Sequence, residues 1–412
     1  MKQVVAAGSE STLDTWVTFP SLADLKEFVY RYRGPLAEHM KDAYTAVRDG
    51  IGGEVSIDGK TGDAQRLIAT ADRRGARVRC ALGGNGGQEA AALRALGANV
   101  IFTGCLFPCQ LSRLDPEERK HFDGIDISFA CSSEKKPTSV IIQARGTNRY
   151  ILCEGEGRRI DQLRPYLQRL PSILRRAFNK YGRIDMVNLV GWHVLFANSI
   201  SDRDFHMVER IIRKIRKVIA SPLFTDAGSF AAFDEREKRL LCRIYSMFDI
   251  LSVNGDEVLQ VSRAIGAETK DEFQAMRNIL ESSGGISTIW VHSLDYQASL
   301  STKHGRGLLE NAQLTAATAG VCRVEKGSYP TSEDLAKRRK TKNYSEKGLK
   351  TVDHASKEYG DKIGGAELVV TPCYKAREFT STVGAGDVAS AAYTYVMAGG
   401  EIGKKPKTPT AE

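Results

Sequence analysis

The chain has 412 residues, of which 42% are hydrophobic and 26% charged, a composition typical of a globular protein rather than a disordered or fibrous one. No apolar run approaches the ~20 residues that a membrane-spanning helix requires, and the stretch MKQVVAAGSE lacks the charged-then-apolar plan of a secretory signal. We therefore expect no membrane partner, and we expect the chain to work in the cytoplasm.

The formal net charge of +9 predicts an affinity for anions. Many of the surplus lysines fall in LAKRRKTKNYSEKGLK (335–350) and GKKPKTP (403–409). Apart from Tyr344, no aromatic residues interleave with these cations, as a stacking platform for nucleic acid would need. We interpret the basic runs as a solvated face or a mobile loop and do not expect nucleic acid as a partner.

The eight cysteines, at positions 80, 105, 109, 131, 153, 242, 322 and 373, form no metal or disulfide pattern. Cys105 and Cys109 are the single close pair, and no Cys or His cluster follows at zinc-site spacing. We expect reduced and mostly buried thiols.

Apolar segments and helical segments alternate from the first residues onward. Strands are predicted at 2–8, 184–195, 221–230, 286–300 and 366–376, a helix at 205–220, strand–loop–helix–strand within 76–104, and helix–strand–loop–helix within 239–266. This alternation predicts an α/β fold in which helices cover both faces of a parallel sheet. Such sheets bind ligands in the loops beyond the carboxyl ends of their strands.

Two stretches differ from this pattern. Residues 9–60 and about 105–160 are rich in short β-prone pieces and turns, such as GIDISFACSS and TSVIIQARGTNRYILCEG. We predict that they form a small β-rich subdomain, built from two insertions into a large α/β domain that accounts for the rest of residues 1–412.

The most informative loop is Val383-Gly384-Ala385-Gly386-Asp387, which passes into an apolar helix. Glycines let backbone amides approach an anion closely, and the helix dipole favours negative charge there. Asp387 is consequently either the cap of the helix or a base that removes a proton from a hydroxyl.

Two further loops carry candidate binding groups. In SVNGDEVLQV (252–261), Asn254, Asp256 and Glu257 lie where a strand turns into a helix, and their oxygens suit either Mg²⁺ or a helix cap. In GGNGGQEAAALRALG (83–97), Asn85 and nearby amides either face a polyhydroxy ligand or form a tight turn; the spacing matches neither a dinucleotide fingerprint nor a P-loop.

Taken in order, these motifs resemble the ribokinase superfamily, and within it the ADP-dependent glucokinase and phosphofructokinase branch. The matching segments run from the glycine loop before Asn85 through LVGWHVL (189–195), RIYSMFDILSVNGDEVL (243–259), WVHSLDY (290–296) and STVGAGD (381–387). The resemblance implies a ribokinase-like parallel-sheet sandwich with the β-rich subdomain as a lid. It also implies a kinase that uses ADP as phosphoryl donor and releases AMP.

The resemblance assigns a role to each candidate residue. Asp387 would be the base, and the amides of Gly384, Ala385 and Gly386 would form the anion hole. The acceptor, a sugar or sugar phosphate, would contact Asp14, Asn85 and Gly84, with Glu54 as an acid of the lid. The nucleotide would contact Arg149, Asn254, His292 and Val383, and Mg²⁺ would involve Glu257 and Asp226.

Some of these assignments have local alternatives. His292 can be a buried structural histidine, and Glu54 an exposed glutamate of a strand. The family carries a His-x-Glu motif before Asn-x-x-Glu, whereas this chain has Phe224 and Asp226. This departure points to a divergent subgroup.

Two other functions stay open at this point, and so does the oligomeric state. The two alternative functions are an ATP-dependent ribokinase-type kinase of sugars or nucleosides, and a catalytically silent relative that binds nucleotide or sugar. The chain is expected to be a monomer or a homodimer.

Overall fold

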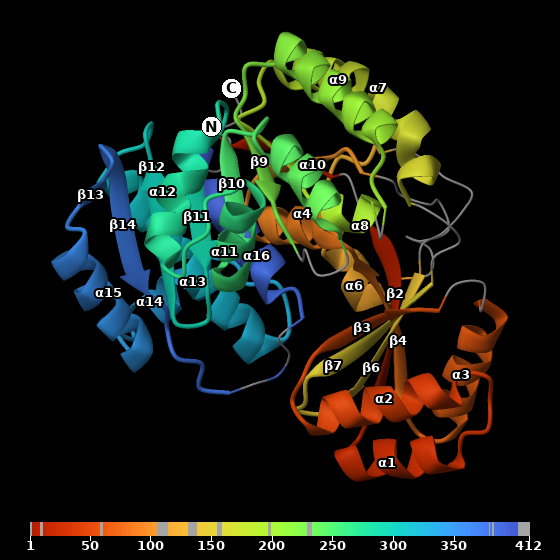
Figure 1. The fold of residues 1–412 in the computed structure, drawn as a ribbon. Coiled ribbons are helices and arrows are strands. Elements are labelled where there is room, and N and C mark those ends of the chain that lie inside the picture. Colours follow the sequence, from red (N-terminus) through yellow and green to blue (C-terminus); the bar gives the residue numbers. More distant parts are fainter. Residues whose placement is uncertain are drawn as a thin grey trace, which may run out of the picture.

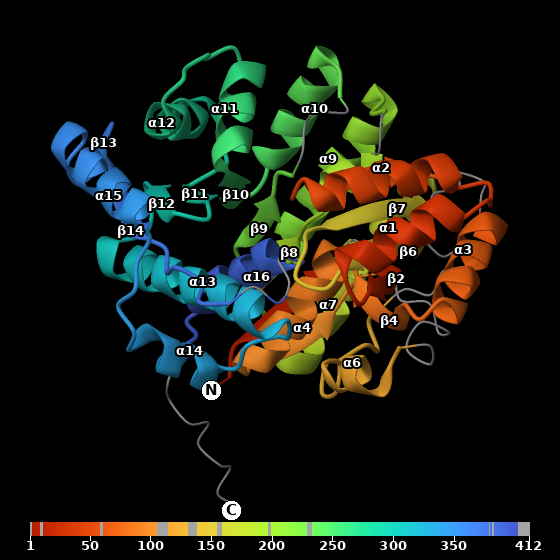
Figure 2. The ribbon, with the colours of Figure 1, turned by 90° about the horizontal axis from the view of Figure 1, so that it is seen from below.

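The structure is a computed structural model that describes residues 2–8, 11–57, 61–104, 114–130, 138–154, 159–196, 199–228, 233–378, 380 and 383–402. These residues form two lobes of unequal size (Figure 1). The larger lobe contains a nine-stranded sheet and the smaller one a five-stranded sheet. Seen from below, the small lobe lies beside one end of the large sheet (Figure 2).

The large sheet has the strand order β13-β14-β12-β11-β10-β9-β8-β1-β5. Its bounds are β1 (Val4–Gly8), β5 (Asn99–Phe102), β8 (Met186–Leu189), β9 (Leu223–Asp226), β10 (Ile250–Asn254), β11 (Thr288–His292), β12 (Tyr296–Ser301), β13 (Lys362–Ile363) and β14 (Ala366–Pro372). The strands from β5 to β11 are parallel, whereas β12, β14 and β13 pair antiparallel at one end. The sheet is therefore mixed, because β11 and β12 are joined by a short turn that can only reverse the chain.

Helices cover both faces of this sheet, as the alternation of segments predicts. One layer consists of α7 (Arg159–Tyr181), α8 (Trp192–Phe196), α9 (Asp202–Val218), α10 (Glu235–Tyr245), α11 (Gly255–Ala264), α12 (Glu272–Ser282) and α15 (Glu346–Glu358). The other consists of α4 (Asn85–Leu96), α13 (Arg306–Lys326), α14 (Ser332–Arg339) and α16 (Ala385–Met397). Each layer buries its own apolar cluster against the sheet, and that burial is the main stabilising contribution to the lobe.

The small lobe contains a sheet with the order β3-β7-β6-β2-β4. Its elements are β2 (Thr12–Phe19), α1 (Leu22–Arg31), α2 (Ala37–Arg48), β3 (Gly53–Ser56), α3 (Thr61–Arg73), β4 (Arg77–Gly83), β6 (Thr138–Ala144) and β7 (Arg149–Glu154), while the short helix α6 (Pro116–Lys120) follows β5 in the chain. The three helices pack on one face of the sheet and share an apolar cluster with it. The opposite face turns toward the large lobe.

This lobe differs from the predicted β-rich subdomain in two respects. Residues 22–48 contain helices α1 and α2 where the sequence predicted short strands and turns. The side chain of Ser21 caps α1 by accepting a hydrogen bond from the Asp24 N–H, a local signal that this prediction did not use. Helix α3 and strand β4 lie outside the two predicted insertions, and β4 pairs with β2 along seven residues. The strand that precedes Asn85 thus belongs to the small lobe, and the chain enters the large lobe at that residue.

The basic run 335–350 is largely helical rather than a loop. It contains the end of α14 and the start of α15. Arg338 is 6% exposed, donates hydrogen bonds to Lys375 O and Glu325, and lies over the Tyr374 ring. Part of this run therefore stabilises the fold instead of forming a solvated face. The second run, 403–409, lies outside the described residues.

The described cysteines agree with the expectation of free thiols. Cys242, Cys322 and Cys373 are buried, and Cys80 and Cys153 are half-buried. Cys105, Cys109 and Cys131 lie outside the described residues. In the part of the chain that the structure describes, no helix has the length and hydropathy needed to cross a bilayer.

Candidate active site

Asp387 lies in the first turn of α16, at the edge where the two lobes meet. The N-cap of this helix is Gly384, which adopts the left-handed conformation with φ of 70°, and Asp387 is the third helical residue. The interpretation of Asp387 as the cap itself is therefore wrong. The positive φ favours glycine at position 384, and a Cβ there would also stand 2.9 Å from Gln88 Oε1 and displace that amide group.

A second helix begins opposite Asp387. Helix α4 starts at Asn85 behind Gly84, whose φ is 75°, so the predicted tight turn between strand and helix is present. Asn85 Nδ2 donates a hydrogen bond to Asp387 Oδ1 at 2.9 Å. Two helix N-termini consequently meet at one carboxylate, and their positive ends favour a bound anion.

A buried polar group lies one turn further along α4. Glu89 is 1% exposed and accepts a hydrogen bond of 3.0 Å from Asn188 Nδ2, which also contacts Thr394 on α16. Burial is the main cause that raises the pKa of Glu89 well above its usual range; the Asn188 bond opposes this, and the charges of Asp387 and Asp226 add to it. Glu89 is thus held between α4, β8 and α16, in surroundings that favour its protonated form.

The carboxyl ends of three parallel strands place the other acidic candidates side by side. Asp226 ends β9, and the register of β10 and β11 sets Asn254 opposite His292. His292 Nε2 and Asp226 Oδ1 are 3.6 Å apart, which is long for a hydrogen bond but close enough for an ion pair. Glu257 and Asn254 form a reciprocal capping box at the start of α11.

The charges in this group depend on one another. Burial and the neighbouring Asp226 raise the pKa of Glu257 to about 7. For Asp226, burial raises the pKa, but the His292 ring outweighs it and the net shift is downward. Burial lowers the pKa of His292, and Asp226 more than reverses this. The site is therefore a histidine–carboxylate pair beside a second carboxyl group.

The altered motif on β9 has a structural consequence. Phe224 is fully buried in the apolar cluster under α4, α13 and α16, and Asp226 projects from the same side of the strand two residues later. The aromatic ring at position 224 contributes packing and no polar group. Asp226 is left as the carboxylate of this strand.

The small lobe presents its own polar residues to Asp387. Asp14 on β2 is 8% exposed and accepts a hydrogen bond from Thr12 Oγ1 at 2.7 Å. Arg149 begins β7, and the negative charges of Asp387, Glu54 and Asp14 all act on its guanidinium. Arg149 Nε is buried, and no described residue accepts a hydrogen bond from it. An anion entering between the lobes would satisfy this donor.

Glu54 is exposed, as the simpler interpretation predicts. It lies on β3, and its Oε1 accepts a hydrogen bond of 2.8 Å from Cys153 Sγ. Its charge acts on Arg149. Glu54 therefore lies on the face of the small lobe that turns toward the site.

A cavity of about 660 Å³ opens beside the turn at the start of α16. Asn254, His292, Ala385 and Gly386 line it, and so do small or apolar residues of α13 and of the segment after β14, including Ala316, Gly320, Val321, Cys373 and Tyr374. Lys347 and Lys375 line it as well. A largely apolar cavity that also contains two helix-terminal residues and two lysines suits an aromatic base joined to phosphate groups.

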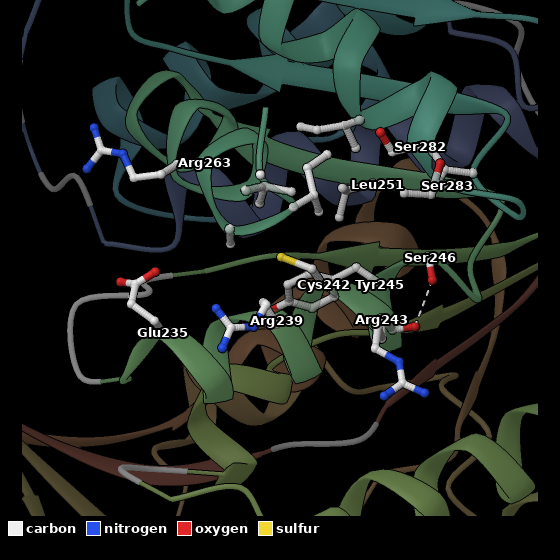
Figure 3. Close-up of a pocket in the computed structure, with 16 residues that line it drawn as sticks. Glu235, Arg239, Cys242, Arg243, Tyr245, Ser246, Leu251, Arg263, Ser282 and Ser283 are labelled. Carbon is white, nitrogen blue, oxygen red and sulfur yellow. Dashed lines mark hydrogen bonds between the residues drawn. The ribbon is translucent and has the colours of Figure 1, made fainter. Parts of the chain in front are cut away.

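A second cavity, of about 400 Å³, lies between α10, α11 and α12 (Figure 3). Cys242, Tyr245 and Leu251 contribute to its walls, and Glu235 and Arg263 lie at its outer end (Figure 3). None of the predicted site residues lines it. The predicted site residues therefore lie elsewhere, around Asp387 and at the carboxyl ends of β9, β10 and β11.

The structure brings most predicted residues together and adds several that the sequence did not indicate. Around Asp387 it places Asn85, Gly384 and Arg149. At the carboxyl ends of the neighbouring strands β9, β10 and β11 it places Asp226, Asn254, Glu257 and His292. The additions are Glu89, Asn188, Gln88, Tyr329 and Arg323. Gln88 and Glu89 lie in α4, Asn188 in β8, Arg323 in α13 and Tyr329 in the loop after α13, so no local pattern marked them as one group.

Comparison with known proteins identifies what this architecture is similar to. The family model described as ADP-specific phosphofructokinase/glucokinase conserved region matches residues 40–396. None of the curated proteins compared with this chain matches it.

Solved structures resemble it over almost its full length. A hypothetical ADP-dependent phosphofructokinase from Pyrococcus horikoshii OT3 aligns with a TM-score of 0.71 at 14% identity, covering 97% of this chain and 98% of that one. An ADP-dependent kinase in complex with fructose-6-phosphate and ADPβS aligns at 0.71 and 16% identity, covering 98% and 95%. A probable sugar kinase from Rhizobium etli CFN 42 aligns at 0.52 and 13% identity, covering 96% and 87%.

Proposed function

The chain belongs to the ADP-specific phosphofructokinase/glucokinase family, and from this premise we propose that it transfers a phosphoryl group from ADP to a hydroxyl of a sugar or sugar phosphate, releasing AMP. The observation that carries the proposal is the meeting of Asp387, Asn85 and the Gly384 turn at two helix N-termini. An acidic side chain and an anion-binding turn share one point there.

The geometry supports a direct transfer. Asp387 would take the proton of the acceptor hydroxyl as that oxygen forms a bond to the β-phosphorus of ADP and the bridging bond to AMP breaks. The amides of Gly384, Ala385 and Gly386 would hold the charged oxygens of the phosphoryl group. A carboxylate at a helix N-terminus is a weak base, and this suits late proton removal, after the bond to phosphorus has begun to form.

The two sides of the cleft would bind the two substrates. In our proposal the nucleotide occupies the 660 Å³ cavity, with its base against the wall of α13 and its phosphates at Asn254, Val383 and His292. Arg149 would donate to the phosphates from the small lobe, which explains a buried donor without a described acceptor. The acceptor would lie between Asp387 and the small-lobe residues Asp14 and Glu54, beside Gly84 and Asn85.

The acidic residues at the strand ends fit a divalent cation held partly by water. Asp226 Oδ1 is buried and accepts no hydrogen bond from the described residues, although His292 Nε2 lies 3.6 Å from it, and the charge of Asp226 acts on Glu257. Among those residues no cluster of three or more His, Cys, Asp or Glu groups could hold a metal by itself. Asp226 and Glu257 would therefore hold Mg²⁺ together with water and the phosphates, and the ion would neutralise phosphate charge.

Formation of AMP provides the test. The purified chain with Mg²⁺ would be given ADP or ATP separately, with sugars, sugar phosphates and nucleosides as acceptors. We expect AMP with ADP and one class of sugar acceptor. Turnover with ATP alone would refute the choice of donor, and binding of nucleotide without turnover on any acceptor would refute the kinase assignment.

A further inference from the structure

Val383, the residue before the anion-hole loop, is held from two sides. Its side chain packs with Trp16, Ala81 and Ile141 on the inner face of the small lobe. Its carbonyl oxygen accepts a hydrogen bond of 3.0 Å from Arg323 Nε on α13. Val383 thus lies between the small lobe and the buried Arg323 guanidinium group of the large lobe.

Arg323 is rigidly positioned. It is 5% exposed, donates from Nη1 to Gly327 O at 3.0 Å, and its guanidinium carbon lies 4.7 Å from the centre of the Tyr329 ring. The Tyr329 hydroxyl in turn donates to Gln88 Oε1 at 2.6 Å. Each contact fixes the plane of the guanidinium group, so that Nε has one direction in which to donate.

The charge of Arg323 is not neutralised by a described carboxylate. Among the residues that the structure describes, none forms an ion pair with it, although α13 and α14 contain several acidic residues that pair with other cations. Its Nη2 would stand 3.7 Å from a Cβ on Gly384. A full positive charge therefore lies directly behind the turn whose amides face the cleft.

From this arrangement we propose that Arg323 is a positioning residue, which orients the Val383–Gly384 peptide so that the N–H of Gly384 points at the phosphoryl group in transfer. The peptide unit is planar and trans, so its carbonyl and its N–H point in opposite directions. Holding the carbonyl of Val383 against α13 thus directs the N–H of Gly384 toward the cleft. The left-handed conformation of Gly384 then lets the following amides converge on the same anion.

This inference rests on the proposed function for its kinetic consequence. A donor aimed at charge that develops in the transition state contributes ~10²- to 10³-fold to kcat and less to ground-state binding. Loss of the Arg323 bond is therefore expected to lower kcat strongly and to leave KM for ADP within about threefold, the signature of an interaction made mainly in the transition state.

The kinetic test compares Arg323→Met and Arg323→Lys with a matched control. Methionine keeps bulk against Tyr329 without a donor, and lysine restores one donor and the charge. We expect kcat to fall ~10²-fold in Arg323→Met and about tenfold in Arg323→Lys, since one ammonium group replaces a planar fork. Arg216→Met, which removes another arginine bonded to a main-chain carbonyl, far from the cleft, should keep the wild-type kcat.

Crystal structures of wild type and Arg323→Met make the proposal testable without turnover. The expected difference is a rotated Val383–Gly384 peptide in the variant; an unchanged peptide, or an unchanged kcat, would overturn the proposal. If Arg323→Met does not fold, the same two measurements on Arg323→Lys decide, and wild-type kcat with a displaced Val383 carbonyl would overturn it. A wild type inactive on every acceptor would refute the proposed function instead, while the structures would still decide the role of Arg323.

Discussion

Replacing Asp387 with asparagine separates catalysis from folding in the proposed mechanism. The substitution keeps the shape of the side chain, and the amide oxygen can still accept the hydrogen bond that Asn85 donates at 2.9 Å. What disappears is the negative charge at the third position of α16 and the ability to take a proton. The loss of charge at a helix N-terminus costs only ~0.3–1 kcal/mol.

The catalytic cost should be much larger. Removing a positioned general base lowers turnover by ~10²- to 10⁴-fold, which equals about 3–5 kcal/mol of activation free energy. The variant is informative because the expected loss of unfolding free energy is much smaller than the expected rise in activation free energy. We expect Asp387→Asn to unfold near the wild-type temperature and to release AMP at under a hundredth of the wild-type rate.

The assay measures initial rates of AMP release and, in parallel, thermal unfolding by circular dichroism. Asp334→Asn is the control, since Asp334 is also the third residue of its helix, α14, and takes part in a capping box away from the cleft. It should keep the wild-type rate. A variant Asp387→Asn that retained more than about a tenth of the wild-type rate would have lost less than the ~10²-fold expected on removal of a base. Asp387 would then not be the base.

Three other substitutions test separate parts of the site. Gly384→Ala should lower kcat ~10²-fold, because alanine is strained at φ of 70° and its Cβ would stand 2.9 Å from Gln88 Oε1; steady-state kinetics will measure this. Relative to wild type, Glu89→Gln should raise Tm by an amount that grows as the pH rises above ~4.3. Above that pH the unfolded wild-type chain releases the proton of Glu89, whereas the folded state keeps it because burial raises the pKa of Glu89. Melting curves of both proteins across this pH range will measure the difference. Asn254→Ala should cost about 1 kcal/mol of unfolding free energy by removing the cap of α11 and should weaken ADP binding with Mg²⁺, measured by urea unfolding and calorimetry.

Each of these expectations has a contrary result. Wild-type turnover in Gly384→Ala would mean that the turn does not bind the phosphoryl group. A difference in Tm between Glu89→Gln and wild type that is constant with pH would mean that the folded state does not hold a proton on Glu89. Unchanged ADP affinity in Asn254→Ala, with the stability loss present, would limit Asn254 to its role as a helix cap.

Local patterns in the sequence were sufficient to predict most strands of the large sheet, but they missed β13 and did not show that the strand before Asn85 belongs to the small lobe. The apolar runs before Asn254 and Asp226 predict β10 and β9, and the spacing of Asn254 and Glu257 permits the capping box that the structure contains. These features depend on interactions between residues a few positions apart, so the order of residues carries them directly. The same is true of the Gly384 turn, where glycine permits a conformation that other residues rarely adopt.

Tertiary structure alone decided which of these groups meet. Asn85 and Asp387 are 302 positions apart in the chain, Glu89 and Asn188 are 99 apart, and Arg323 and Val383 are 60 apart. Each pair forms because parallel strands bring their carboxyl ends to one edge and because α4, α13 and α16 pack on the same face of the sheet. That order of strands and helices reflects the burial of the whole apolar surface, a sum over distant residues that no short stretch of the sequence contains.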